Sequence, residues 1–157
     1  MATSPVKYTK FFWRAKYFNS KPVSVTSSTV TLGDKHVGGL TMLNLAAGVA
    51  ATLPAATGSG KHFKVMVGTA SNGSTIRVTG NDTFVGGYLA QNDGDSSAAT
   101  VDAYTPAAAD NRITMTTAGG GGLVGDWLEF TDIAADKWHV FGYFSGVTDP
   151  TTRFSTV

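Results

Sequence analysis

The chain has 157 residues, enough for one domain with a sizeable core, and it contains 12 basic residues, 11 acidic residues and no cysteine. The absence of cysteine excludes disulfides, thiolate chemistry and cysteine-based zinc sites. Charged residues make up only 15% of the chain, against about 25% in an average globular protein, which is typical of a surface that is partly covered in an assembly.

The first 22 residues differ in composition from the rest of the chain. They hold five of the 12 basic residues, six aromatic residues and no acidic residue, which leaves 7 basic and 11 acidic residues, a net charge of −4, in residues 23–157. Soluble domains normally cover aromatic side chains gathered at this density, so we expect residues 1–22, the basic aromatic arm, to bind another surface. The docking residues that we expect are Lys7, Lys10, Phe11, Phe12, Trp13, Arg14, Lys16, Tyr17 and Phe18.

Four kinds of surface are open to such an arm: single-stranded nucleic acid, a membrane surface, a protein partner or its own domain. We favour a protein partner, because the acidic body offers no positive groove for nucleic acid and the arm does not separate its apolar and charged residues cleanly onto two faces of a helix. No stretch approaches the roughly 18 apolar residues that span a bilayer, and no secretory signal is recognisable. We therefore expect no nucleic-acid and no membrane partner, and synthesis in the cytoplasm.

After Pro22 the sequence alternates with period two and is interrupted by turn residues. Short strands are predicted in residues 23–32, 40–45 and 50–53, and the clearest half-buried strand in residues 63–67. The dipeptide Asn72-Gly73 is the strongest hairpin signal, because a type I′ turn needs positive φ at both central residues. It predicts that residues 75–79 pair with residues 63–67.

Further strands are predicted in residues 83–89, 101–104, 112–117, 125–131 and 138–145, with a polar loop at residues 91–100 and a tail without a regular pattern at residues 147–157. Strands at this spacing are typical of antiparallel sandwiches and barrels. The predicted fold is an all-β, antiparallel sandwich or barrel of about ten short strands, residues 23–157, with an extended N-terminal arm.

Few residues carry a recognisable chemistry. His36, His62 and His139 have no metal-ligand spacing, so we interpret each as a surface or interface residue. The single glutamate, Glu129, shares one side of its predicted strand with Trp127 and faces solvent or a subunit.

Two loops resemble ligand-binding motifs only in part. The Gly-Ser-Gly-Lys run at residues 58–61 lacks the other residues of a phosphate-binding loop. Asp93 and Asp95 lie in a loop that offers Ca²⁺ two carboxylates but no bidentate glutamate, so a solvated loop tip is favoured over a Ca²⁺ site. We predict no catalytic residue, no cofactor and no metal, and therefore no enzyme activity.

Two segments resemble a known family. LTMLNLAAGVAATLPAATGSGKHFKVMVGT (residues 40–69) is similar to a strand, Ala-Ala-Gly turn, Leu-Pro strand and alternating strand found in structural proteins of tailed bacteriophages. GGLVGDWLEFTDIAADKWHVFGYFSGVTDPTTRF (residues 121–154) resembles the end of the same proteins. The chain thus resembles phage head decoration, or cement, proteins over residues 30–154. The resemblance excludes the arm, and the Ala-Ala-Gly and Leu-Pro pattern also occurs in tail-fibre modules.

The resemblance implies a homotrimer that binds the major capsid protein on the outer surface of the virion and stabilises the head, without catalysis or a cofactor. Two alternatives stay open: a trimeric tail-fibre or receptor-binding module, and a glycan-binding domain in which Trp127 or Trp138 stacks on a sugar. The number of copies in each virion separates decoration, which needs hundreds, from a tail part.

Overall fold

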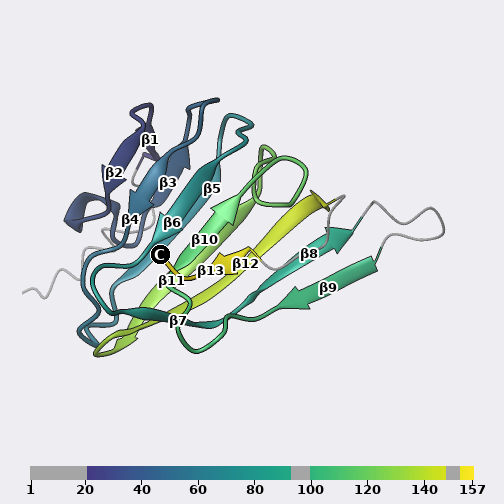
Figure 1. Cartoon of the computed structure of the whole chain (residues 1–157). Helices are drawn as coiled ribbons and strands as arrows, with labels where there is room; N and C mark the ends of the chain where they lie inside the picture. The colour runs from purple at the N-terminus through teal and green to yellow at the C-terminus, as the bar shows by residue number, and fades with distance from the viewer. Residues whose placement is uncertain (1–20, 93–99, 148–152) are drawn as a thin grey trace, which may run out of the picture.

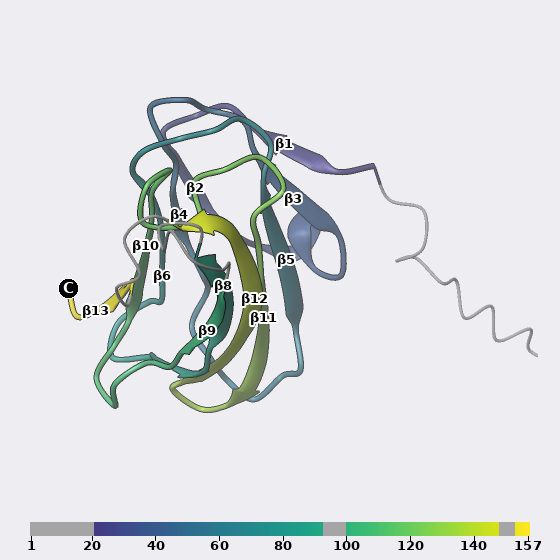
Figure 2. The same cartoon turned by 90° about the vertical axis from the view of Figure 1, so that its right-hand side faces the viewer.

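Alternation of apolar and polar residues determines the strands, because successive side chains of a β-strand point to opposite faces. Strand β5 (His62–Val67) buries Phe63, Val65 and Val67 and leaves the residues between them partly exposed. The computed structural model describes residues 21–92, 100–147 and 153–157. In these residues thirteen strands form two sheets that pack face to face as a β-sandwich (Figures 1 and 2).

The larger sheet has eight strands and the smaller sheet five. In pairing order, the larger sheet contains β1 (Val23–Val25), β3 (Leu40–Leu43), β5, β11 (Trp127–Ala134), β12 (Lys137–Val147), β8 (Tyr88–Asn92) and β9 (Thr100–Tyr104), with β7 (Thr83–Gly86) beside the first part of β12. The smaller sheet contains β13 (Phe154–Ser155), β10 (Arg112–Met115), β6 (Ser74–Arg77), β4 (Ala50–Thr52) and β2 (Thr29–Thr31). A 3₁₀ turn, η1 (Asp34–His36), lies between β2 and β3 in the chain.

The first six strands alternate between the two sheets and form a coil of three turns, the parallel coil. Strands β1, β3 and β5 pair in parallel in the larger sheet, and β2, β4 and β6 pair in parallel in the smaller sheet. Parallel neighbours need a long crossover connection, and here the crossover passes through the opposite sheet. Each turn of the coil therefore adds one strand to each layer.

The corners of the coil stack closely on one another. Gly48 has a φ of 94°, and a Cβ atom at this position would lie 2.7 Å from the carbonyl carbon of Gly73 in the next turn. The backbone N–H of Val49 donates to Oγ of Ser74, and Ser74 also contacts the buried hydroxyl of Ser71 at 2.8 Å. Glycine at position 48 is therefore required by its backbone conformation and by the closeness of the next corner.

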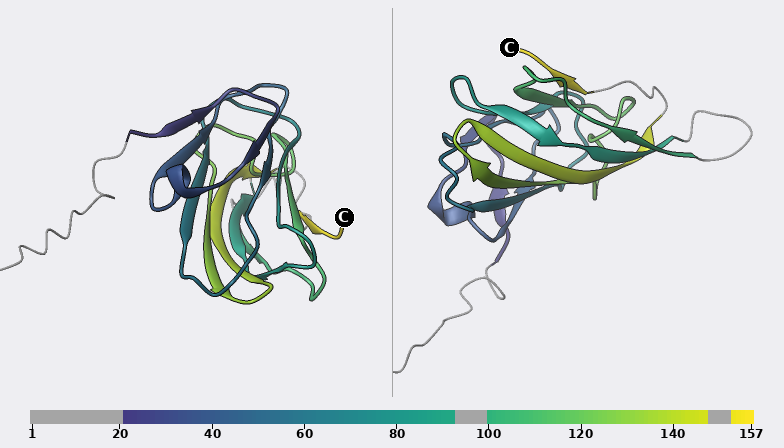
Figure 3. Two further views of the ribbon diagram at one scale, coloured as in Figure 1. Left: turned by 90° about the vertical axis from the view of Figure 1, so that its left-hand side faces the viewer. Right: turned by 90° about the horizontal axis from the view of Figure 1, so that it is seen from below.

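The second half of the sandwich is built around two long strands, β11 and β12, and most of its strand pairs are antiparallel. Strand β11 pairs with β5 on one edge and with β12 on the other, while β10 lies between β6 and β13. Strands β7 and β8 pair in parallel with successive parts of β12. The β8–β9 pair extends beyond the rest of the larger sheet (Figures 1 and 3).

Aromatic side chains fill the space between the sheets. Trp138 is fully buried, lies 5.7 Å from Phe63 between ring centroids, and donates its indole N–H to the carbonyl of Pro54. Tyr88 packs against Phe144 at 4.4 Å and against Phe154 at 5.4 Å. Burial of large aromatic residues is the main stabilising contribution that such a core provides.

The predicted all-β sandwich is confirmed, but three details of the prediction are wrong. The sheets are mixed, because the parallel coil replaces the antiparallel order that was expected for the first half. The described residues form thirteen strands, where about ten were predicted. The tail ends in β13, whose Phe154 is buried. The basic aromatic arm, apart from Lys21 and Pro22, lies outside the described residues.

The hairpin predicted at Asn72-Gly73 does not form, since β5 and β6 belong to different sheets. Asn72 does not have the positive φ that a type I′ turn requires. Hydrogen bonds instead join this connection to the segment between β10 and β11: the N–H of Val67 donates to the carbonyl of Asp126, and that of Ser71 to the carbonyl of Gly122.

Candidate interaction surfaces

The residues predicted to dock the protein lie in the part of the chain that the structure does not describe. This prediction therefore lies outside the described residues. The predicted docking residues are Lys7, Lys10, Phe11, Phe12, Trp13, Arg14, Lys16, Tyr17 and Phe18. The loop with Asp93 and Asp95, weighed as a Ca²⁺ site, also lies outside the described residues.

A row of apolar residues crosses the outer face of the larger sheet. The strand register places these side chains directly beside one another on six neighbouring strands, and each is partly or fully exposed. This apolar row consists of Met42, Met66, Trp127, Tyr143, Leu89 and Ala103. A sheet face that is not covered by another layer usually carries polar residues, so such a row indicates an interaction surface.

Charged and aromatic side chains surround Trp127 at the centre of this row. The ammonium of Lys64 lies 4.3 Å from the Trp127 ring centroid, and Phe141 meets the ring edge-on at 5.9 Å. Lys64 also pairs with Glu129 at 2.8 Å, and His62 lies 3.6 Å from the other carboxylate oxygen. Burial opposes ionisation of Glu129, but Lys64 and His62 outweigh it and lower the pKa of this carboxyl. Glu129 thus faces outward, as predicted.

A shallow depression of about 250 Å³ adjoins the far end of the row. Its lining is almost wholly apolar, with Leu89 36% and Phe141 47% exposed. Strand β9 has no neighbour on its second edge among the described residues. Exposed apolar side chains next to a free strand edge are features through which chains associate.

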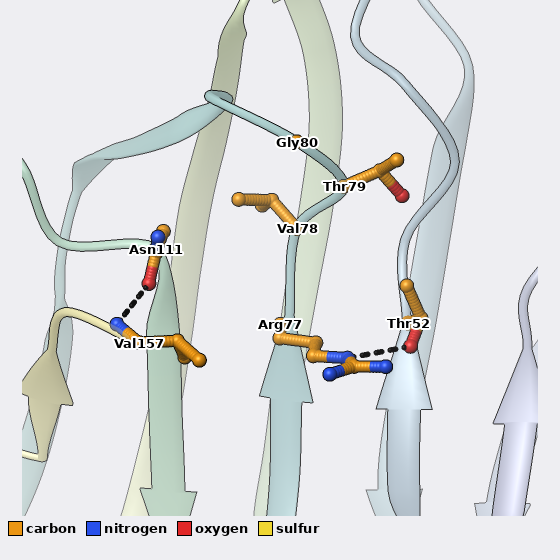
Figure 4. A pocket seen from close by; sticks show the side chains of 7 residues that line it. All are labelled: Thr52, Arg77, Val78, Thr79, Gly80, Asn111 and Val157. Atoms are coloured by element: carbon orange, nitrogen blue, oxygen red, sulfur yellow. Dashed lines mark hydrogen bonds between the residues drawn. The ribbon is translucent and has the colours of Figure 1, made fainter.

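The outer face of the smaller sheet has the opposite character. Its strands present threonines and two arginines, and none of its outward-facing residues is acidic. A pocket of about 340 Å³ opens at the end of this sheet, between β4, β6 and β10 (Figure 4). The lining residues are Thr52, Arg77, Val78, Thr79, Gly80, Asn111 and Val157.

Of the two tryptophans that were predicted to stack on a sugar, the structure leaves one accessible. Trp138 is fully buried and cannot stack on a ligand. Trp127 is partly exposed on the outer face of the larger sheet.

The three histidines were predicted to lie on the surface or at an interface. His139 is exposed and His62 lies on the surface, but the prediction is wrong for His36, which is 1% exposed. Burial, and secondarily Lys35, lowers the pKa of His36.

Four buried aspartates have structural roles that the sequence did not reveal. Each of them accepts hydrogen bonds from backbone N–H groups and so fixes a loop. The bonds run from Ala56 to Asp82, from Ala107 to Asp110, from Leu123 and Ser145 to Asp126, and from Thr57, Gly58 and Ser59 to Asp132. Two of them, Asp110 and Asp126, each end a turn that begins three residues earlier.

The carboxylates of these aspartates accept hydrogen bonds from the protein's own backbone and do not form a reactive cluster. In residues 21–92, 100–147 and 153–157 no group of three or more potential metal ligands occurs. In the same residues, no helix is long and apolar enough to cross a membrane. The features that remain are the two contrasting outer faces.

Comparison with known proteins gives no relative from which a role can be transferred. No family model matches the chain, and no curated protein and no solved structure matches it. The function must therefore be argued from the two outer faces and from the arm.

Proposed function

We propose that this protein is a structural virion component that binds the outer surface of a phage capsid and stabilises it, as head decoration proteins do. The observation that carries the proposal is the apolar row on the outer face of the larger sheet. Two further features add to it: buried acids that are used structurally, and an arm rich in cations and aromatic residues. These features favour protein association over catalysis.

In this proposal the two binding elements have separate tasks. The apolar row is covered by sister subunits in a trimer, because a soluble protein rarely leaves a continuous apolar surface exposed. The arm binds the major capsid protein, with its aromatic residues as anchors and its cations increasing the association rate. Three arms on one trimer bind together, so modest single contacts give tight attachment.

The test is co-sedimentation of the protein with undecorated heads. Truncating Trp13 or Phe12 to alanine should cost about 2 kcal/mol of binding free energy or more, whereas replacing Lys7 or Lys10 with glutamine should cost about 0 to 1. Raising the salt concentration should weaken the contribution of the lysines alone.

Deletion of residues 1–22 provides the decisive comparison. The described strands begin at Val23. The truncated protein should therefore keep the melting temperature of its sandwich and no longer bind the head. A Thr75→Ala variant, altered on the outer face of the smaller sheet, serves as the control that still binds. Full occupancy of heads by a folded, arm-deleted protein would rule out the arm as the capsid anchor.

One observation favours a second candidate, a glycan-binding module of the phage tail. Trp127 lies partly exposed beside Glu129, and an aromatic face next to a carboxylate suits the apolar and hydroxyl surfaces of a sugar. Quenching or a blue shift of tryptophan fluorescence with host-surface saccharides, lost in Trp127→Ala, would support this candidate. A few copies in each virion, in place of hundreds, would support it too.

A further inference from the structure

We propose that the Arg77–Arg112 pair on the outer face of the smaller sheet is a binding site for an oxyanion group, a phosphate or a carboxylate of a small ligand. The two arginines lie directly opposite each other on the antiparallel strands β6 and β10. Directly opposed residues have Cβ atoms about 4.5–5.5 Å apart, and like charges in this position destabilise a sheet. Such an arrangement needs a compensating function.

Neither arginine has a carboxylate partner among the described residues. The ion pairs found there involve Lys61, Lys64 and His62 only. Nε of Arg77 donates to the hydroxyl of Thr52 at 3.1 Å, and Nε of Arg112 donates to that of Ser155 at 3.1 Å. Each guanidinium thus leans toward the strand on its far side and bonds a neutral oxygen, as two like charges do without a counterion between them.

The pocket beside Arg77 offers hydrogen-bond donors. Figure 4 shows Arg77 and Thr52 joined on one wall and Asn111 bonded to the backbone of Val157 on the other. The amide oxygen of Asn111 accepts that bond, which leaves its NH₂ group as a donor. Thr52 accepts from Arg77, so its hydroxyl hydrogen is also free to donate. No acidic side chain lines the pocket, and the α-carboxylate of Val157 forms no ion pair with Arg77 or Arg112.

Hydrogen-bond donors without an acidic side chain beside them are the chemistry that recognises an oxyanion. Guanidinium groups bind phosphate and carboxylate through two parallel N–H···O bonds, which makes arginine more selective than lysine for these groups. A bound oxyanion would draw both guanidinium groups inward from Thr52 and Ser155 and would remove their mutual repulsion. The site lies on the face opposite the apolar row and is independent of the proposed capsid role.

The test is thermal unfolding of the full chain, followed by tryptophan fluorescence at low ionic strength and pH 7. Inorganic phosphate and malonate are titrated separately against sodium chloride of equal ionic strength. We expect one or both to raise the melting temperature beyond the chloride control, since a ligand that binds only the folded state stabilises it. A response to phosphate identifies a phosphate-bearing ligand, and a response to malonate identifies a carboxylate-bearing one.

Two variants give the site a signature of its own. Arg112→Gln and Arg77→Gln should each weaken the apparent affinity for the responding anion at least tenfold. Without anion, the same variants should melt at or above the wild-type temperature, because they remove a like-charge opposition. Lys35 is an exposed cation on η1. Its replacement in Lys35→Gln should change neither the apparent affinity for the anion nor the melting temperature without anion.

The proposal is overturned if neither anion exceeds the chloride control. It is also overturned if both arginine variants respond to the anions as strongly as the wild type does, because the stabilisation is then a general salt effect.

Discussion

Asp132 accepts more hydrogen bonds than any other buried aspartate in the described residues. Its carboxylate takes the backbone N–H groups of Thr57, Gly58 and Ser59 at 2.7–3.1 Å, together with the hydroxyls of Thr57 and Ser59. Burial alone would raise the pKa of this carboxyl, but the hydrogen bonds from Ser59, Gly58 and Thr57 outweigh burial and lower it well below its usual range. The folded state therefore favours the charged form.

Replacing Asp132 with asparagine should lower the free energy of unfolding by about 3 kcal/mol, because an amide keeps one acceptor and turns an NH₂ group toward backbone donors. Urea unfolding measures the change. Asp34→Asn is the matched control, since the Asp34 side chain is 94% exposed and forms a surface ion pair with Lys61. Equal stability of the two variants would contradict the structural role of Asp132.

The same residue predicts how stability depends on pH. A carboxyl whose pKa is lowered by folding contributes stability that is fully present above its unfolded value, about 3.9. That contribution is lost as the pH falls below about 4 and the group protonates in the unfolded state first. Unfolding measured from pH 6 to pH 2.5 should show this loss in the wild type and a flatter profile in Asp132→Asn.

Asp126 behaves in the opposite sense. Burial, the largest influence, raises the pKa of its carboxyl despite hydrogen bonds from Ser145 and Leu123. Folding then disfavours the charged form, so the contribution of Asp126 weakens as the pH rises above the ordinary aspartate range. At pH 7, Asp126→Asn should accordingly lower the free energy of unfolding by about 1 kcal/mol, which is less than the loss expected for Asp132→Asn. Equal costs in urea unfolding would show that charge does not distinguish the two sites.

Among the elements, the corner between β3 and β4 is held in close backbone contact with the next corner of the coil. Gly48→Ala places a Cβ atom 2.7 Å from Gly73 in a residue with a φ of 94°. We expect a loss of about 2 kcal/mol or more, because strain and overlap with backbone add. Gly60→Ala is the control: its φ is 71°, but no atom lies within 4 Å. A melting-temperature change that is no larger for position 48 than for position 60 would contradict the stacked corner.

The sequence predicted individual strands better than their partners. Alternation in β5 and β11 was readable because each strand buries one face. The same alternation does not distinguish a parallel from an antiparallel neighbour, so the parallel coil was missed. At Asn72-Gly73 the local turn preference was overridden by tertiary hydrogen bonds from Val67 and Ser71.

The candidate surfaces were predictable only in part for the same reason. The outward position of Glu129 and Trp127 follows from the alternation within one strand. The pairing of Arg77 with Arg112 depends on the register of two strands far apart in sequence, and nothing in either segment indicates it. The apolar row likewise appears only when six strands are placed side by side.

At the scale of the whole molecule, the contrast between the two outer faces predicts an oligomer in which the outer face of the larger sheet is covered by neighbouring subunits. The protein should be a trimer at micromolar concentration, as measured by light scattering coupled to gel filtration. Phe141→Asp, placed beside Trp127 on the exposed face of β12, should dissociate it, since a buried unpaired charge is strongly unfavourable. Thr75→Asp, on the smaller sheet, should leave it trimeric. A monomeric wild type would remove the support for a trimer.

The parallel coil also determines how the protein carries mechanical load. Tension along the arm enters the fold at β1, a strand of three residues that pairs only with β3 among the described residues. We expect such a strand to detach first, followed by the next turn of the coil, while the antiparallel pairs around β11 stay closed. Freeing residues 23–39 lengthens the tether by roughly 50–60 Å. A subunit attached through its arm would therefore yield and extend under strain before it was pulled from its anchor.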